Sequence, residues 1–152
     1  MINWGIIGAG NIAKRFVKGL AFDDRACLYA ISCRSLAKAE SFREFADFEV
    51  AYDSYDALLD DPKVDIVYVS LPHKFHCEYV IKALRKHKAV LCEKPLALNT
   101  VEVEKIIQVA KEENVFFMEA MKSKFVPMYQ HILSLVKRGI IGEVEYVYAC
   151  FS

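Results

Sequence analysis

A glycine-rich turn near the N-terminus restricts what this chain can fold into more than any other feature. The pattern is G-x-G-x-x-A, made by Gly8, Gly10 and Ala13, and it lies between an apolar run at residues 2–7 and a helix expected over 10–20. Gly8 permits a tight turn, Gly10 lets a pyrophosphate approach the backbone, and Ala13 lets the helix pack closely on the strand. The first helical turn also offers free N–H groups to an anion. The pattern predicts a dinucleotide cradle; the plain alternative is an ordinary glycine-rich turn in another α/β protein.

Strands and helices are expected to alternate through the first 120 residues. Apolar runs bounded by charged or turn residues predict strands, and apolar residues at helical spacing predict the helices between them. We expect strands at 2–7, 26–31, 50–52, 64–69, 89–92 and 115–118. We expect helices at 10–20, from a Ser35 cap to about 45, at 54–59, at 75–86 and from Asn99 or Thr100 onward. This alternation predicts an α/β fold with a doubly wound parallel sheet of the Rossmann type and right-handed crossovers.

The last thirty residues depart from this alternation. Residues 126–138 predict a helix, Gly139 and Gly142 flank a turn, and 143–151 are rich in β-branched and aromatic residues. We expect residues 1–120 to form the nucleotide-binding domain. We expect 121–152 to form a connecting helix and the first strand of a second domain, with Met128 and most aromatic residues in the core. An apolar strand left without neighbours is expected to pair with another chain, which predicts a homo-oligomer.

Composition excludes several classes of partner. The chain has 20 Lys and Arg against 20 Asp and Glu, so its charge indicates neither nucleic acid nor an anionic membrane as a partner. No apolar run reaches the roughly 20 residues of a membrane-spanning helix, and the N-terminus predicts a strand rather than a secretory signal. The five cysteines contain no C-x-x-C pair. We interpret them as reduced, buried thiols of a cytoplasmic protein.

The residues after the second strand predict which nucleotide binds. An acidic residue there bonds the ribose hydroxyls of NAD, whereas an arginine accommodates the 2′-phosphate of NADP. The segment is Ser32-Cys33-Arg34-Ser35, without an acidic residue, and Lys38 follows one helical turn later. Arg34 has a planar fork suited to phosphate, so we favour NADP over NAD. The alternative is a solvated arginine at a helix start.

Two further strand ends hold reactive side chains. Glu93-Lys94-Pro95 follows a buried strand, at the edge where open α/β sheets bind ligands. Lys94 could act there as a donor or acid with Glu93 orienting it, and the alternative is a strand-end salt bridge. His73 and His76 follow another strand. A third metal ligand is not evident, so we expect no metal and interpret the two histidines as cofactor or substrate contacts, or simply as residues at a helix start.

Several motifs together resemble one known family. They are GIIGAGNIA at 5–13, SCRSLAKAESF at 32–42, LPHKFH at 71–76, AVLCEKPLALN at 89–99 and MEAMKSKFVPMY at 118–129. The chain resembles the glucose–fructose oxidoreductase/inositol dehydrogenase (Gfo/Idh/MocA) family of NAD(P)-dependent oxidoreductases, and within it the dimeric dihydrodiol dehydrogenase-like branch. The resemblance runs through essentially the whole sequence.

The resemblance implies roles for individual residues. Glu93 and Lys94 would be catalytic and lie beside the nicotinamide, with Lys94 near the reacting carbonyl or hydroxyl. Lys124 stands where relatives usually have arginine. The implied cofactor-binding residues are Gly8, Ala9, Gly10, Asn11, Ile12, Cys33, Arg34, Lys38, Ser70, Leu71, His73, His76, Glu93 and Lys94.

The resemblance also implies a function and a missing part. Family members are more than twice as long, and their second domain has the substrate pocket and the main proton donor. We therefore expect this chain to be part of a longer protein. The expected function is hydride transfer between NADP(H) and the carbonyl or alcohol of a sugar, polyol or dihydrodiol. The alternative is a non-catalytic module that senses a dinucleotide, because a fold alone does not prove chemistry.

Overall fold

The computed structural model describes residues 1–150. These residues form two compact units, one covering Met1–Ala120 and the other beginning at Met121.

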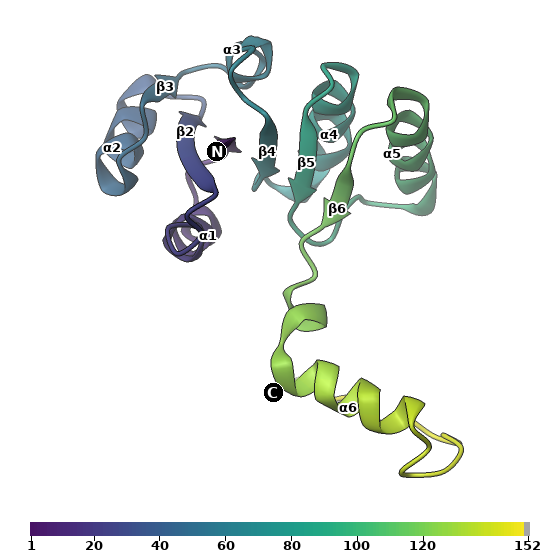
Figure 1. Cartoon of the computed structure of the whole chain (residues 1–152). Helices are drawn as coiled ribbons and strands as arrows, with labels where there is room; N and C mark the ends of the chain where they lie inside the picture. The colour runs from purple at the N-terminus through teal and green to yellow at the C-terminus, as the bar shows by residue number, and fades with distance from the viewer. Residues whose placement is uncertain (151–152) are drawn as a thin grey trace. The chain divides into compact units, whose positions relative to one another are not determined.

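A six-stranded parallel sheet is the centre of the first unit (Figure 1). Its spatial order is β3-β2-β1-β4-β5-β6. The chain therefore adds β2 and β3 on one side of β1, crosses back, and adds β4, β5 and β6 on the other side. Every pair of neighbouring strands is parallel. The expected doubly wound sheet is confirmed. The strands are β1 (Ile2–Ile7), β2 (Ala26–Ser32), β3 (Val50–Tyr52), β4 (Ile66–Val69), β5 (Ala89–Cys92) and β6 (Phe117–Glu119).

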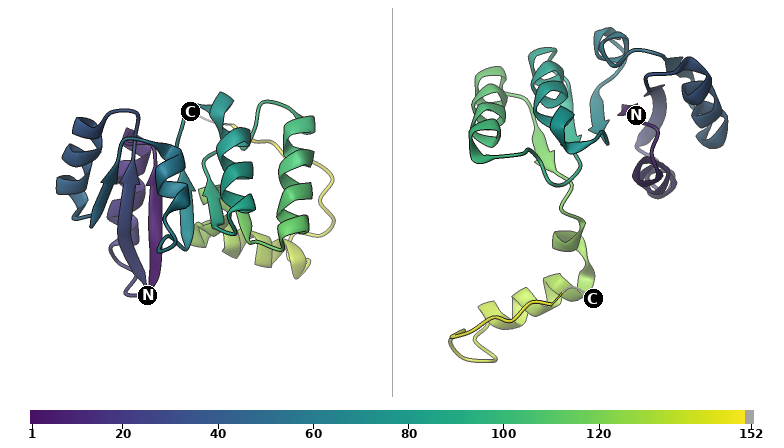
Figure 2. Two further views of the ribbon diagram at one scale, coloured as in Figure 1. Left: turned by 90° about the horizontal axis from the view of Figure 1, so that it is seen from above. Right: turned by 180° about the vertical axis from the view of Figure 1, so that it is seen from behind.

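Helices cover the sheet on both sides (Figure 2). On one face, Ala13 and Val17 of α1 (Asn11–Leu20) and Phe42 of α2 (Leu36–Ala46) pack with Ile6 and Tyr68. The core on the other face is larger, because three helices contribute to it. They are α3 (Tyr55–Asp60), α4 (His76–Arg85) and α5 (Thr100–Glu113). Burial on both faces explains why β1 and β4 are continuously apolar at their carboxyl halves.

Element boundaries differ from the sequence prediction in a few places. Residues His73–Phe75 form a separate 3-10 turn, η1, so the helix expected at 75–86 begins at His76 and ends at Arg85. Ser35 occupies the N-cap of α2, but its side chain makes no capping hydrogen bond, which corrects the predicted cap. By contrast, Asn99 caps α5 as expected, since its Oδ1 accepts from Glu102 N at 3.0 Å.

A buried lysine ties together the amino ends of β4 and β5. Lys88 is 5% exposed, and its ammonium donates to the carbonyl oxygens of Asp61 and Val64 at 2.7 and 2.8 Å. The hydroxyls of Tyr29 and Tyr52 both donate to Oδ2 of Asp61, at 2.9 and 2.8 Å. This polar network fixes the amino ends of these strands. The candidate site lies at the opposite, carboxyl ends.

The cysteines only partly match their expected burial. All five are free thiols. Cys33 and Cys92 are buried, Cys27 and Cys77 are half-buried, and Cys150 is exposed, so the expectation of buried thiols is wrong for Cys150.

The second unit contains a 3-10 turn, η2 (Lys122–Phe125), and the helix α6 (Pro127–Lys137). The strand expected at 143–151 is not formed by residues 143–150, and Phe151 lies outside the described residues. A strand needs a hydrogen-bonded neighbour, and this unit offers none within its described part. No residue of α6 is buried, and Met128, expected in the core, is 65% exposed.

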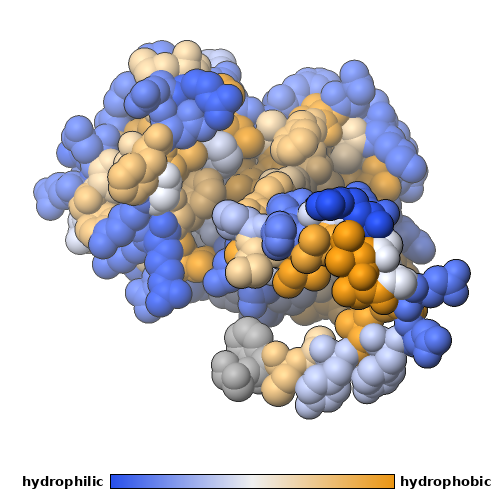
Figure 3. Space-filling model, turned by 60° about the horizontal axis from the view of Figure 1, so that its bottom comes forward, coloured by the Kyte–Doolittle hydropathy of each residue, from blue (hydrophilic) through white to orange (hydrophobic). Residues whose placement is uncertain are grey.

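Apolar side chains therefore gather at the surface of the second unit (Figure 3). The large ones that are exposed are Met121, Phe125, Val126, Met128, Tyr129, Ile132, Ile140, Ile141, Val144, Tyr146, Val147 and Tyr148. Among the described helices, none is long and apolar enough to cross a membrane.

Candidate nucleotide-binding and active site

The carboxyl ends of four neighbouring strands bring most of the predicted site residues to one edge of the sheet. Ile7 pairs with Val69, Val69 with Cys92, and Cys92 with Glu119. The residues that follow these positions are Gly8, Ser70, Glu93 and Ala120, which consequently line the same edge. The chain reverses its direction of winding between β1 and β4, and open α/β sheets bind ligands at such a switch point.

The turn after β1 is built around Gly8. Its φ is +102°, a conformation that residues with a side chain rarely adopt, and a Cβ there would lie 2.7 Å from Ser70 O. Its N–H donates to Ser32 O at 2.9 Å. The Ser70 hydroxyl lies within hydrogen-bonding distance of the carbonyl oxygens of Ile7 and Gly8, at 3.1 and 3.0 Å. Ser70, predicted to line the cofactor, thus also holds the turn in place.

Gly10 leaves open space where the helix begins. A Cβ built on Gly10 would meet no atom within 4 Å, and no side chain caps the N-terminus of α1. The N–H of Lys14 is bonded to Gly10 O, at 3.2 Å, so the amides of Asn11 and Ile12 precede the first bond of the helix. Ala13 is fully buried, as close packing of helix and strand requires. This open, amide-lined turn fits the pyrophosphate of a dinucleotide.

A pocket of about 260 Å³ lies beside the end of β2. Arg34 lines it together with residues that follow β3 and β4, whereas Lys38 is exposed and does not line it. Cys33 is buried, and its thiol donates to Ser35 O at 3.0 Å. The full lining is Arg34, Asp53, Ser54, Tyr55, Asp56, Pro72, Phe75 and Tyr79.

This pocket adds residues that the sequence did not single out. Three aromatic side chains and a proline supply flat apolar surface of the kind that a purine base prefers. Asp53 and Asp56 line the same pocket as Arg34, so acidic groups are present although none follows β2. Asp53 stands directly after β3, and a search of every strand end would have found it.

Glu93 and Lys94 lie together, but the carboxylate does not reach the lysine ammonium. Glu93 Oε2 accepts from the backbone N–H of Lys94 at 3.2 Å, and Oε1 accepts from the Tyr68 hydroxyl at 2.5 Å. The Lys94 side chain is exposed, and the Lys94–Pro95 peptide bond is cis. Lys94 is thus presented to solvent at the edge of the sheet, while Glu93 is tied back to the core.

His76 lies beneath the surface instead of on it. Its ring is fully buried, with Nδ1 2.9 Å from Pro95 O and Nε2 2.7 Å from Leu71 O. It therefore connects the loop after β4 to the loop after β5. His73, in contrast, is exposed, and Leu71 is 8% exposed.

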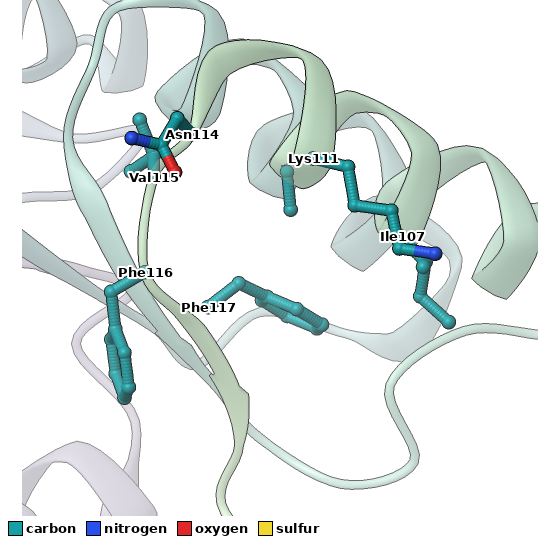
Figure 4. Close-up of a pocket in the computed structure, with 7 residues that line it drawn as sticks. Ile107, Lys111, Asn114, Val115, Phe116 and Phe117 are labelled. Atoms are coloured by element: carbon teal, nitrogen blue, oxygen red, sulfur yellow. The ribbon is translucent and has the colours of Figure 1, made fainter.

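A second hollow, of about 380 Å³, lies at the other edge of the sheet (Figure 4). Its lining comes from the end of α5 and from the residues that enter β6, including Ile107, Lys111 and Phe117. Because it lies at the amino end of β6, it is remote from the cradle. Across residues 1–150, no three His, Cys, Asp or Glu side chains are grouped closely enough to hold a metal ion.

The sequence matches a family model over residues 2–121, described as an oxidoreductase family with an NAD-binding Rossmann fold. Among curated relatives, trans-1,2-dihydrobenzene-1,2-diol dehydrogenase of Xenopus tropicalis is 40% identical over 98% of this chain. The enzyme of the same name from Bos taurus is 35% identical over 99% of it. In each case the chain spans 46% of the relative's length.

Solved structures agree with this match. KijD10, a 3-ketoreductase from Actinomadura kijaniata in complex with NADP and TDP-benzene, superposes with a TM-score of 0.86 and 34% identity, over 93% of this chain and 44% of its own. An NAD binding oxidoreductase from Klebsiella pneumoniae gives a TM-score of 0.88 and 29% identity, over 93% and 40%. The chain belongs to the Gfo/Idh/MocA oxidoreductase family, with its NAD(P)-binding Rossmann fold, and to the dihydrodiol dehydrogenase-like branch of that family.

Proposed function

We propose that this chain is the nucleotide-binding part of an NADP(H)-dependent oxidoreductase. The reaction is hydride transfer to or from a carbonyl or alcohol carbon of a sugar, polyol or dihydrodiol. The observation that carries the proposal is the open, amide-lined turn at Gly10, placed at the switch point of the sheet. The names of the relatives, which are dehydrogenases of a dihydrodiol and a ketoreductase in complex with NADP, support the substrate class and the cofactor.

Each part of the sheet edge has a role in this proposal. The turn from Gly8 to Ile12 binds the pyrophosphate, and the pocket at Arg34 receives the adenosine end, where the guanidinium meets the 2′-phosphate. When bound, the nicotinamide supplies or accepts the hydride. Lys94 donates a hydrogen bond or a proton to the substrate oxygen, which an exposed ammonium at this edge is able to reach. Residues 1–120 form the nucleotide domain, and 121–152 begin a second domain.

A single small substitution tests the cradle. Gly10→Ala adds one methyl group in the space reserved for the pyrophosphate and contacts no protein atom, so the fold should remain within about 1 kcal/mol of its original stability. Calorimetric titration should show that it binds NADPH at least tenfold more weakly. The control is Gly19→Ala, which also adds a methyl group in open space on α1, and it should bind NADPH normally. Normal NADPH binding by Gly10→Ala would refute the assignment.

A non-catalytic dinucleotide sensor is the second candidate. The exposed apolar side chains of the second unit favour it, because a sensor needs a protein partner and such surfaces bind partners. The two candidates differ at Lys94, because a sensor does not need an acid beside the nicotinamide. In the full-length protein, turnover of a polyol or dihydrodiol that is lost in Lys94→Met, with NADPH affinity retained, would support the enzyme and reject the sensor.

A further inference from the structure

A tyrosine buried in the sheet is bonded to the carboxylate next to Lys94. Tyr68, on β4, is 1% exposed, and its hydroxyl donates to Glu93 Oε1 at 2.5 Å. Its ring stacks on Phe16 of α1, with centroids 3.9 Å apart and planes inclined by 13°. Phe16 packs in turn against Trp4, at 5.3 Å. Stacking on Phe16 thus holds one face of the Tyr68 ring, and the Tyr68 hydroxyl has a fixed position.

The second oxygen of the same carboxylate reaches Lys94. Glu93 Oε2 accepts from the Lys94 amide at 3.2 Å, so the carboxylate connects the core tyrosine to the backbone of the lysine. The N–H of Glu93 also donates to Val69 O at 2.9 Å. Glu93 is therefore held at its backbone and at both carboxylate oxygens, which is the arrangement that fixes a site loop on a rigid support.

We propose that Tyr68 is a positioning residue: through the Glu93 carboxylate it fixes the direction in which the loop after β5 presents Lys94. This inference rests on the proposed function, in which Lys94 faces the reacting oxygen. Tyr68 itself does not contact substrate, because its side chain is buried.

The chemistry of the hydroxyl suits a permanent donor. Burial raises the pKa of Tyr68 well above its ordinary value, and the hydrogen bond to Glu93 raises it further. The hydroxyl therefore keeps its proton throughout the neutral range and can only donate to a carboxylate. The hydrogen bond from Tyr68 to Glu93 therefore persists throughout that pH range.

The chain offers a matched control for this bond. Tyr29 lies on the neighbouring part of the same sheet, is 5% exposed, and its hydroxyl likewise donates to a carboxylate, that of Asp61, at 2.9 Å. Asp61 belongs to the network at the opposite edge of the sheet and does not touch Lys94. Tyr68→Phe and Tyr29→Phe thus remove the same atom from the same type of bond, and only the first is connected to the site.

The test measures exchange of the Lys94 amide by NMR in the whole 152-residue chain. Tyr68→Phe should speed this exchange by about 2- to 10-fold, the change expected when one net hydrogen bond no longer orders its acceptor. Tyr29→Phe should leave it unchanged. In a Glu93→Ala background, Tyr68→Phe should have no further effect, because its action passes through that carboxylate. Unchanged exchange in Tyr68→Phe, equal acceleration in Tyr29→Phe, or acceleration that persists without Glu93 would each overturn the proposal.

A second reading separates this proposal from the proposed function. NADPH should shift the Lys94 resonances of the wild-type chain and of Tyr29→Phe, and it should shift them differently in Tyr68→Phe. If the wild-type chain binds no NADPH, the proposed function fails, while the exchange data still decide whether Tyr68 positions the loop. If NADPH binds and shifts Lys94 identically in all three proteins, Tyr68 has no positioning role at the site.

Discussion

At the scale of single residues, Arg34 is the side chain on which the proposed preference for NADP(H) depends. It is exposed, lines the pocket beside β2, and shares that pocket with Asp53 and Asp56. A guanidinium that pairs with the 2′-phosphate contributes a charge-assisted contact, whereas NADH offers it no such group. In the proposed site the guanidinium offsets the repulsion between the 2′-phosphate and these carboxylates, of which Asp56 is already paired with Lys82 at 3.1 Å.

Arg34→Ala should therefore weaken NADPH binding by about 10- to 100-fold and NADH binding by much less. Parallel calorimetric titrations with the two nucleotides measure the difference. The control is Arg43→Ala, which removes an exposed arginine of α2 that pairs with Glu40 and does not line the pocket. Equal losses for both nucleotides would show that Arg34 does not contact the 2′-phosphate.

The same substitution should have opposite effects on stability at Gly8 and at Gly19, because the two backbone environments differ. Gly8→Ala would place a Cβ against Ser70 O in a backbone conformation with φ of +102°, and it should cost about 1–3 kcal/mol. Gly19→Ala lies in a helix with open space around it, and it should stabilise the chain by about 0.5–1 kcal/mol. Urea unfolding of both variants checks the pair, and a neutral Gly8→Ala would contradict the described turn.

At the scale of elements, helix caps explain why sequence signals differ in reliability. Asn99 and Ser35 both stand at N-caps, and both residue types predict one. Of the two, only Asn99 makes the capping bond, in which its Oδ1 accepts from Glu102 N; the Ser35 side chain makes none. Asn99→Ala should cost about 1 kcal/mol of unfolding free energy, whereas Ser35→Ala should cost only a few tenths. Similar losses in the two variants would contradict the difference in capping.

The doubly wound sheet could be predicted from sequence because its signal is local. Each strand is a short apolar run and each helix has apolar residues at regular spacing, so the order of elements follows directly. The predicted strand at 143–151 was wrong over residues 143–150 because strand propensity is satisfied only by a paired neighbour. The bond from Tyr68 to Glu93 joins residues 25 positions apart, and the packing that directs a buried tyrosine leaves no pattern in the sequence.

At the scale of the whole molecule, the buried tyrosines make the free energy of unfolding depend on pH in the alkaline range. Burial, with the hydrogen bond to Asp61 as a further cause, raises the pKa of Tyr29 to about 12 from its ordinary 10.0. Between these two values the unfolded chain has lost the proton that the folded chain keeps. Stability should therefore fall as the pH rises through this window.

Thermal unfolding across pH 9 to 12 measures this effect as a difference between two proteins. The wild-type melting temperature should decrease more steeply between about pH 10 and 12 than that of Tyr29→Phe, because the variant has no proton to lose there. Parallel curves for the two proteins would show that Tyr29 titrates normally in the folded state.

The second unit predicts association of the whole chain. Its large apolar side chains are exposed, and such surfaces promote contact between molecules. We expect sedimentation velocity to show that the average mass rises with protein concentration. Ile132→Lys should reduce this association. Val101→Lys, at an exposed apolar position of α5, is the control and should leave association unchanged. A wild-type chain that stays monomeric at high concentration would contradict this expectation.

The buried ammonium of Lys88 has a practical consequence. Amine-reactive reagents acylate only neutral, accessible amines, and this one is enclosed beneath two carbonyl oxygens while Lys94 stands in solvent. A brief pulse of such a reagent should label Lys94 at once, and it should label Lys88 only in molecules whose sheet has come apart. The ratio of the two labels, read by mass spectrometry, would therefore give the fraction of opened molecules in a mixture.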